Sequence, residues 1–296
     1  MNLKKNGKTL LALLLAVTMV LALAACGSDS PDPVPSSSEE SSSSSESSGS
    51  SSSDSSSDSS SSSDPNKPTP AEIQKKMLTG MVNHYAKNED TVGWLHVPGT
   101  TIDEVVVQAI GDSSNDYYMR RTNLKQENFD GCYFVDFRGH MGSRDKLSKN
   151  TVIYGHSMDD NPESNRFSQL KKYLDIDFAK ENGTIYFSTP DSEMLWQVFA
   201  VFYTDTSFNY IEPNLSNADF MNVVNSARKR SQFNFDVDVT ANDKILTLST
   251  CTYKFTASYP NNYRYVVMAK LLPVGATPGE VKVEVNPAPQ APAGAK

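Results

Sequence analysis

Hydrophobic positions along much of the chain gather in short runs of the kind that forms strands. Eight such runs are rich in Val, Ile, Tyr, Phe and Thr, and turn residues bound most of them. They cover residues 92–97, 101–108, 132–137, 151–155, 184–188, 194–204, 244–250 and 263–271. Eight short runs with few long helices between them are typical of an all-β barrel or sandwich. The pattern therefore predicts a mainly β domain.

A helix is predicted where this domain begins. Thr69 is a suitable N-cap, Pro70 suits the first helical position, and Glu72 completes a capping box. Apolar residues then recur on one face at helical spacing: Ile73, Met77, Met81 and Tyr85. This spacing predicts an amphipathic helix over residues 70–88.

A second helix is predicted over residues 216–233, before the seventh strand-like run. Ser216 and Asp219 resemble a capping pair. An apolar stripe follows at helical spacing: Phe220, Val223, Val224 and Ala227. We interpret this stripe as ordinary core packing.

The segments on either side of the predicted domain, which we place at 70–272, have a different composition. Ser occupies 24 of the 44 positions from residue 27 to residue 70, mixed with Asp and Glu and without any aromatic residue. Such a segment cannot bury enough apolar surface to offset the entropy of ordering it, so we expect 27–69 to be a disordered tether. The Pro- and Ala-rich residues 273–296 are also expected to be a disordered tail, with an edge strand over 281–285 as the alternative.

The first 26 residues predict an export signal. Three lysines precede an apolar run of 16 residues from Leu10 to Ala25, which is shorter than the roughly 20 residues that a membrane-spanning helix needs. The Leu-Ala-Ala-Cys sequence at its end is similar to a bacterial lipobox, in which Cys26 would receive a diacylglycerol thioether and become the mature N-terminus. An uncleaved membrane anchor is the alternative. Both place the remaining chain outside the cytoplasmic membrane and tethered to it.

Charge and cysteine content exclude several classes of protein. The net charge is −8, of which the tether region 27–70 carries −7. The predicted domain has no large basic field, which argues against nucleic-acid binding. Three cysteines exclude a disulfide-rich scaffold and a four-cysteine zinc site, and the four histidines lack metal-ligand spacing. We therefore expect neither a metal nor a cofactor.

Three chemically active residues lie where strand-like runs end or begin. Cys251 follows the run 244–250, His156 follows the run 151–155, and Arg264 stands at the start of the run 263–271. A rigid strand can hold such a side chain at a fixed place beside a loop. Each residue taken alone is a weak signal, because a single Cys or His is more often structural than catalytic.

The other titratable residues are weaker candidates. We interpret Cys132 as a buried thiol, with a Cys132–Cys251 disulfide as the alternative. We interpret His84 and His96 as structural or surface residues. His140 stands in a loop-like context and is a weaker candidate for the base than His156, which follows a strand-like run. Two carboxylates have the chemistry to orient His156, but no spacing places them beside it: Asp136 and Asp243.

Taken together, the sequence segments around His156, Cys251 and Arg264 resemble the sortases, which are cysteine transpeptidases of Gram-positive cell surfaces. The resemblance rests on Tyr154-Gly155-His156, on Thr247-Leu248-Ser249-Thr250-Cys251, and on Arg264 after a further 12 residues. Additional matching segments precede them in the same order: 93–103, 106–108, 115–118 and 131–136. This order is similar to class B and covers residues 71–272. It implies an eight-stranded β-barrel with an N-terminal helix and a helix before the Cys-bearing strand.

Two features depart from the family pattern. Glu104-Val105 stands where the family often has Tyr-Pro, and a lipobox stands where sortases usually keep a membrane-spanning segment. Neither departure touches the three candidate catalytic positions. The second concerns only how the chain is anchored.

The resemblance implies a role for each residue of the site. Cys251 attacks the carbonyl of a Thr in the sorting signal of a secreted protein and forms a thioester. His156 stabilises the thiolate and protonates the leaving amine, and Arg264 stabilises the oxyanion or holds the substrate backbone. Ser249 and Thr250 line the substrate groove, with strand packing as the alternative. An amine of a peptidoglycan cross-bridge or of a pilin Lys then accepts the acyl group, without metal or cofactor.

Two other functions stay open at this point. One is a lipid-tethered surface binding module that has a sortase fold and no activity. The other is a cysteine peptidase that releases its acyl group to water. All three place the chain on the extracellular face of the cytoplasmic membrane, anchored by lipid in a Gram-positive cell envelope.

Overall fold

The computed structural model describes residues 68–109, 111–256 and 261–295. The predicted signal with Cys26 lies outside these residues, as does the tether up to residue 67. Within the part described, no helix is both long and apolar enough to cross a bilayer.

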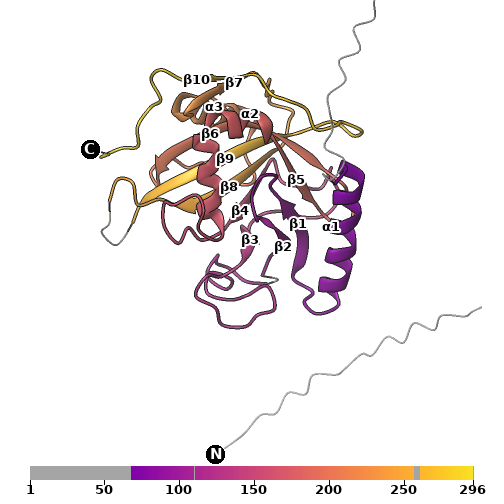
Figure 1. Cartoon of the computed structure of the whole chain (residues 1–296). Helices are drawn as coiled ribbons and strands as arrows, with labels where there is room; N and C mark the ends of the chain where they lie inside the picture. The colour runs from indigo at the N-terminus through magenta and orange to yellow at the C-terminus, as the bar shows by residue number, and fades with distance from the viewer. Residues whose placement is uncertain (1–67, 110, 257–260, 296) are drawn as a thin grey trace, which may run out of the picture. The chain divides into compact units, whose positions relative to one another are not determined.

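Eight strands close into a barrel in the order β1-β2-β3-β4-β8-β9-β6-β5 (Figure 1). The strands are β1 (Thr91–His96), β2 (Asp103–Val107), β3 (Tyr133–Val135), β4 (Asn150–Tyr154), β5 (Thr184–Ser188), β6 (Leu195–Asp205), β8 (Ile245–Cys251) and β9 (Tyr263–Leu271). Each overlaps one of the eight predicted runs. The prediction of an eight-stranded barrel is therefore confirmed.

Helix α1 (Pro70–Tyr85) begins as its sequence predicts. The Thr69 hydroxyl accepts a hydrogen bond from the Glu72 backbone N–H, and the Glu72 carboxylate accepts one from the Thr69 backbone N–H. The helix buries Met77 and Met81 and packs on β1, β2 and β5. It ends three residues before the predicted boundary.

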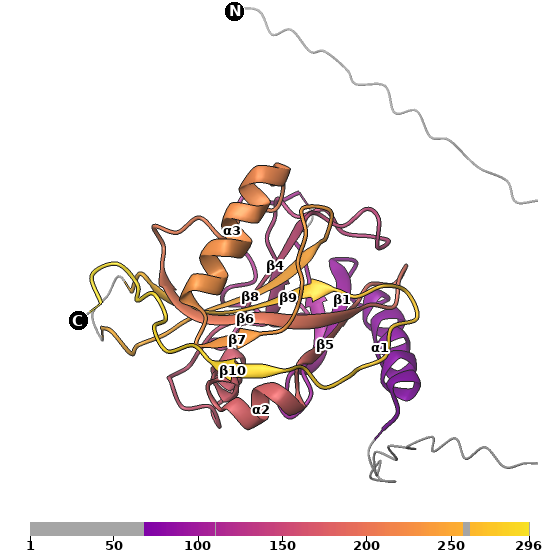
Figure 2. The same ribbon diagram turned by 90° about the horizontal axis from the view of Figure 1, so that it is seen from above.

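Helix α3 (Asn217–Arg230) covers the outer face of the barrel (Figure 2). Its predicted apolar stripe is buried: Phe220, Val223, Val224 and Ala227. These residues form one cluster with residues of β6, β8 and β9, among them Ile245, Val266 and Met268. The interpretation of the stripe as core packing is confirmed.

The C-terminal residues correct one expectation. Strand β10 (Val283–Val285) pairs antiparallel with β7 (Phe233–Phe235), and these two strands lie side by side in Figures 1 and 2. A disordered tail does not describe this stretch, because Val281 and Val283 are buried and belong to the main apolar cluster. The alternating pattern of 281–285, given as the alternative, forms the edge strand.

Two short helices were not predicted and lie between β4 and β5. They are the 3₁₀ helix η1 (Phe167–Leu174) and α2 (Ile176–Glu181). Both are shorter than the window over which hydrophobic periodicity is informative. η1 matters for the site, because it packs against β8.

Candidate active site

The register of three neighbouring strands brings the candidate residues to one end of the barrel. β4 and β8 run parallel, with Tyr154 paired to Ser249. His156 lies two residues after Tyr154, and Cys251 lies two residues after Ser249. β8 and β9 run antiparallel, with Cys251 paired to Arg264. Because adjacent strands lie about 4.8 Å apart, this register makes the three residues neighbours although up to 108 positions separate them in the sequence.

The same strands indicate which face these residues occupy. Successive side chains alternate between the two faces of a strand. Three residues mark the interior face: Ile153 in β4, Leu248 in β8 and Tyr265 in β9. His156, Cys251 and Arg264 each stand an odd number of positions from the marker of their own strand. Continued alternation therefore places all three on the outer face.

The two described cysteines differ in accessibility. Cys251 is partly exposed, whereas Cys132 is buried in a cluster with Val107 and Phe134. Burial raises the pKa of the Cys132 thiol to about 12, so this thiol stays protonated and inert. Both thiols are free. The structure thus excludes the alternative of a Cys132–Cys251 disulfide.

His156 is oriented by a backbone carbonyl. Its Nε2 lies 2.7 Å from the carbonyl oxygen of Met119. A carbonyl oxygen can only accept, so Nε2 carries the proton in the neutral ring and Nδ1 is the nitrogen that exchanges a proton. Burial lowers the pKa of His156 below its ordinary value, and the bond to Met119 opposes that shift.

The two carboxylates considered as partners of His156 are engaged elsewhere. Asp136 binds the Arg138 guanidinium and accepts a hydrogen bond from the Tyr154 hydroxyl. Asp243 binds the Lys270 ammonium. His140 is exposed and lies before β4, at the end of that strand away from His156.

Arg264 is held by the loop that precedes β9. Its Nη1 donates to the carbonyl oxygens of Asn261 and Tyr263, at 2.8 and 2.9 Å. The Asn261 side-chain amide in turn donates to the carbonyl oxygen of Thr252, at 2.7 Å. Asn261 therefore links the Arg264 guanidinium to Thr252, the residue that follows Cys251. The Nε and Nη2 groups of Arg264 donate to neither the Asn261 nor the Tyr263 carbonyl.

Ser249 and Thr250 differ from the expectation that they line a substrate groove. Both are 3% exposed. The Ser249 and Tyr210 hydroxyls lie 2.8 Å apart, and the Thr250 hydroxyl donates to the Gly155 carbonyl at 2.8 Å. These contacts match the alternative of strand packing. The Thr250 bond ties the end of β8 to the residue before His156.

Sequence analysis missed several residues near the site. Met119 acts through its backbone, so no side-chain pattern marks it. Asn261, Asp160 and Lys171 lie in loops or in η1, and their hydrogen bonds reach the residues after His156 and Cys251. No sequence signal places such loops in space.

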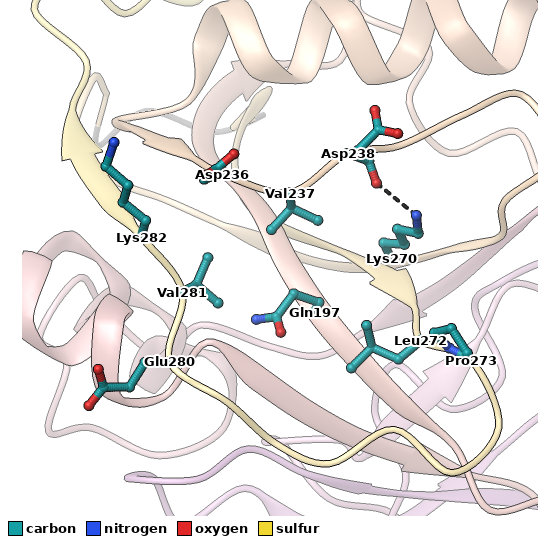
Figure 3. Close-up of a pocket in the computed structure, with 10 residues that line it drawn as sticks. All are labelled: Gln197, Asp236, Val237, Asp238, Lys270, Leu272, Pro273, Glu280, Val281 and Lys282. Atoms are coloured by element: carbon teal, nitrogen blue, oxygen red, sulfur yellow. Dashed lines mark hydrogen bonds between the residues drawn. The ribbon is translucent and has the colours of Figure 1, made fainter. Parts of the chain in front are cut away.

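Figure 3 shows a pocket whose lining includes none of His156, Cys251 and Arg264. Its lining includes Gln197, Lys270 and Val281, and Lys270 donates to the Asp238 carbonyl oxygen at 2.8 Å. Lys270 pairs with Ile245, the first residue of β8, whereas Cys251 is the last. The pocket is therefore at the opposite end of the barrel strands. Among residues 68–109, 111–256 and 261–295, no group of three or more His, Cys, Asp or Glu side chains is arranged to hold a metal ion.

Comparisons with known proteins identify the family of this chain. A family model described as a sortase domain matches residues 95–272. Sortase B of Listeria monocytogenes serovar 1/2a is 34% identical over 186 residues, which are 62% of this chain and 71% of the Listeria protein. Sortase B of Staphylococcus aureus is 32% identical over 188 residues, covering 63% of this chain and 72% of that protein.

Solved structures extend the comparison to the fold. The Staphylococcus aureus sortase B–substrate complex superposes with a TM-score of 0.59 at 30% identity, covering 69% of this chain and 90% of that one. Clostridium perfringens sortase B gives a TM-score of 0.56 at 29% identity, covering 65% of this chain and 99% of that one. The chain thus belongs to the sortase family and is a cysteine transpeptidase of the sortase B type.

Proposed function

We propose that this enzyme cleaves the sorting signal of secreted proteins after a Thr and transfers the protein to an amine of the cell wall or of a pilin. The observation that carries the proposal is the strand register, which sets Cys251 between His156 and Arg264 at one end of the barrel. Similarity to a sortase B–substrate complex supports a peptide substrate. A binding module without activity would not need these three groups to converge.

The first half-reaction forms the acyl-enzyme. The Cys251 thiol transfers its proton to His156 Nδ1, and the resulting thiolate attacks the Thr carbonyl carbon. The Arg264 guanidinium stabilises the negative charge that develops on the carbonyl oxygen. The carbon–nitrogen bond then breaks. His156 Nδ1 gives its proton to the leaving amine, and the acyl group stays on the Cys251 sulfur as a thioester.

The second half-reaction returns the enzyme to its starting state. An acceptor amine attacks the thioester carbon and loses a proton to His156. The thiolate departs from the carbon and takes this proton back from His156. The product is an amide, as in the substrate, so no metal or redox cofactor is consumed. Water in place of the amine would make the enzyme a cysteine peptidase, which is the second candidate outcome.

The proposal assigns supporting roles to the neighbouring residues. Buried Ser249 and Thr250 support the strand that carries the nucleophile, since their hydroxyls bind Tyr210 and Gly155, and any contact with the substrate goes through their backbone. A lipid on Cys26 would anchor the enzyme to the outer face of the Gram-positive cytoplasmic membrane. The Ser-rich tether would then hold the barrel away from the lipid surface.

The test is to incubate the full chain in detergent with fluorogenic peptides of the x-Pro-x-Thr-x type, with and without an amine acceptor. We expect an acyl adduct on Cys251, detected by intact mass and peptide mapping, that resolves into an amide product. The Cys251→Ala variant should form no adduct and lose transfer entirely. Transfer retained by that variant would refute the proposal, and equal hydrolysis with and without the amine would favour the peptidase.

A further inference from the structure

Lys171 is a buried cation next to the candidate active site that the mechanism above does not use. It belongs to η1, and its side chain is only 1% exposed. Burying an ammonium is costly unless it is paired and hydrogen-bonded. Its Nζ lies near four oxygen atoms: Ser157 Oγ, the carbonyl oxygen of Asp159 at 3.2 Å, Asp160 Oδ1 at 3.1 Å and the carbonyl oxygen of Cys251 at 3.5 Å.

These acceptors come from two different parts of the site. Ser157, Asp159 and Asp160 belong to the loop that follows His156, and the fourth acceptor is the backbone of the nucleophile itself. The Lys171 ammonium therefore contacts both the loop that follows His156 and the backbone of Cys251. Burial lowers the pKa of Lys171, while the negative charge of Asp160 opposes that shift and favours the charged form.

Asp160 makes the same connection from the other side. Its Oδ1 accepts a hydrogen bond from the Thr252 hydroxyl at 3.0 Å, and its Oδ2 accepts one from the Tyr253 backbone N–H at 2.8 Å. Thr252 and Tyr253 are the two residues after Cys251. The Asp160 carboxylate thus binds Lys171 and both of the residues that follow Cys251 in the sequence.

These contacts lie just beyond the ladder that joins β4 to β8. β4 ends at Tyr154 and β8 ends at Cys251, so the backbone after each strand has left the ladder between them. Two hydrogen bonds still join the strand ends directly, from the Gly155 N–H to the Ser249 carbonyl oxygen and from the Thr250 hydroxyl to the Gly155 carbonyl oxygen. Beyond them, the position of Cys251 relative to His156 depends on what joins the two loops. A displacement of about 1 Å between reacting groups can lower a rate by roughly a hundredfold.

We propose that Lys171 and Asp160 are positioning residues that clamp the loop after Cys251 to the loop after His156. The inference rests on the proposed roles of Cys251 and His156 and adds residues to that same site. The clamp sets the geometry of the thiol and the imidazole. It therefore affects the chemical step more than the binding of the peptide.

The experiment compares Lys171→Met, Asp160→Asn and the double variant in the full chain. We expect each single variant to lower kcat about tenfold and to leave KM within about twofold. The double variant should be no slower than the slower single variant, because both changes break one network. Asp160 is 32% exposed, so Asp160→Asn tests the clamp even if Lys171→Met fails to fold.

Lys172→Met is the matched control. It removes the same charge from the next residue of η1, where the ammonium pairs with the exposed carboxylate of Glu163. We expect this variant to keep kcat within about twofold of the wild type. A Lys171→Met or Asp160→Asn enzyme that also stays within twofold, or that loses kcat only in proportion to its unfolded fraction, would overturn the clamp.

A second measurement keeps this inference separate from the proposed function. Iodoacetamide alkylates an accessible thiol without any peptide, and peptide mapping reports the rate at Cys251 alone. We expect Lys171→Met and Asp160→Asn to slow this alkylation at neutral pH about threefold or more, whereas Lys172→Met leaves it unchanged. A wild type that is alkylated but transfers no peptide would defeat the proposed function, and the variants' alkylation rates would still decide the clamp.

Discussion

At the scale of single residues, the base of this site is held by a backbone carbonyl. The Met119 carbonyl oxygen fixes the Nε2 proton of His156, and burial favours the neutral ring. A carboxylate in the same place would favour the imidazolium instead. Because the pKa of His156 is lowered, we expect most of these rings to be neutral at pH 7 in the free enzyme.

The lowered pKa of His156 predicts a pH dependence of stability. The unfolded chain binds a proton at this residue below about pH 6.5, whereas the folded protein binds it only at lower pH. Stability should therefore fall as the pH drops through this window, and more steeply in the wild type than in His156→Gln. Urea unfolding at pH 7 and pH 5 measures the difference, and NMR titration of the His156 ring should show a midpoint below 6.5. A midpoint above 6.5 would contradict the prediction.

At the scale of elements, the edge strand β10 covers part of the core. Phe233 and Phe235 of β7 belong to the same apolar cluster as Val281 and Val283. Burying a Val side chain contributes roughly 1.5–3 kcal/mol. The end of the chain therefore acts as a strap on the barrel domain.

Removal of this strap should lower stability without removing the active site. A chain truncated after Thr277 should unfold roughly 6–24 °C below the full chain, because the cluster loses two buried valines. Alkylation of Cys251 at 25 °C should persist, since β4, β8 and β9 remain. A chain truncated after Ala293 keeps β10 and is the control. Equal melting temperatures for both truncations would show that the strap adds no stability.

At the scale of the whole molecule, we propose that the long Ser-rich segment connects the barrel to a lipid on Cys26. Cys26 stands at the end of the predicted export signal, and the predicted domain begins 44 residues later. Anchoring and catalysis should then be separable, because the soluble peptide substrate does not need the membrane.

The prediction is that cells fed a labelled fatty acid attach the label to the wild-type chain and not to Cys26→Ser. In detergent, both chains should transfer the model peptide at the same kcat. Cys132→Ser serves as a control for labelling at another thiol. A wild-type chain without label would favour the uncleaved anchor, and label on Cys26→Ser would place the lipid elsewhere.

Local sequence patterns were enough to predict the individual helices and strands and the chemically active residues. The eight strand runs, the capping box at Thr69 and Glu72, and the apolar stripe of α3 all depend on residues close to each other in the chain, so neighbouring positions suffice to predict them. His156, Cys251 and Arg264 were marked by their places at the ends of strands and by the family resemblance. Their meeting at one end of the barrel required the strand order.

The contacts of each side chain, in contrast, depend on how the barrel closes. The parallel pairing of β4 with β8 crosses 95 positions, and no local pattern specifies that register. The burial of Ser249 depends on Tyr210 from a distant loop, and the orientation of His156 depends on a backbone atom of Met119. The Lys171–Asp160 contacts likewise join a 3₁₀ helix to two loops. Contacts of this kind depend on the closure of the sheet, because they join segments whose separation in the sequence carries no information about their distance in space.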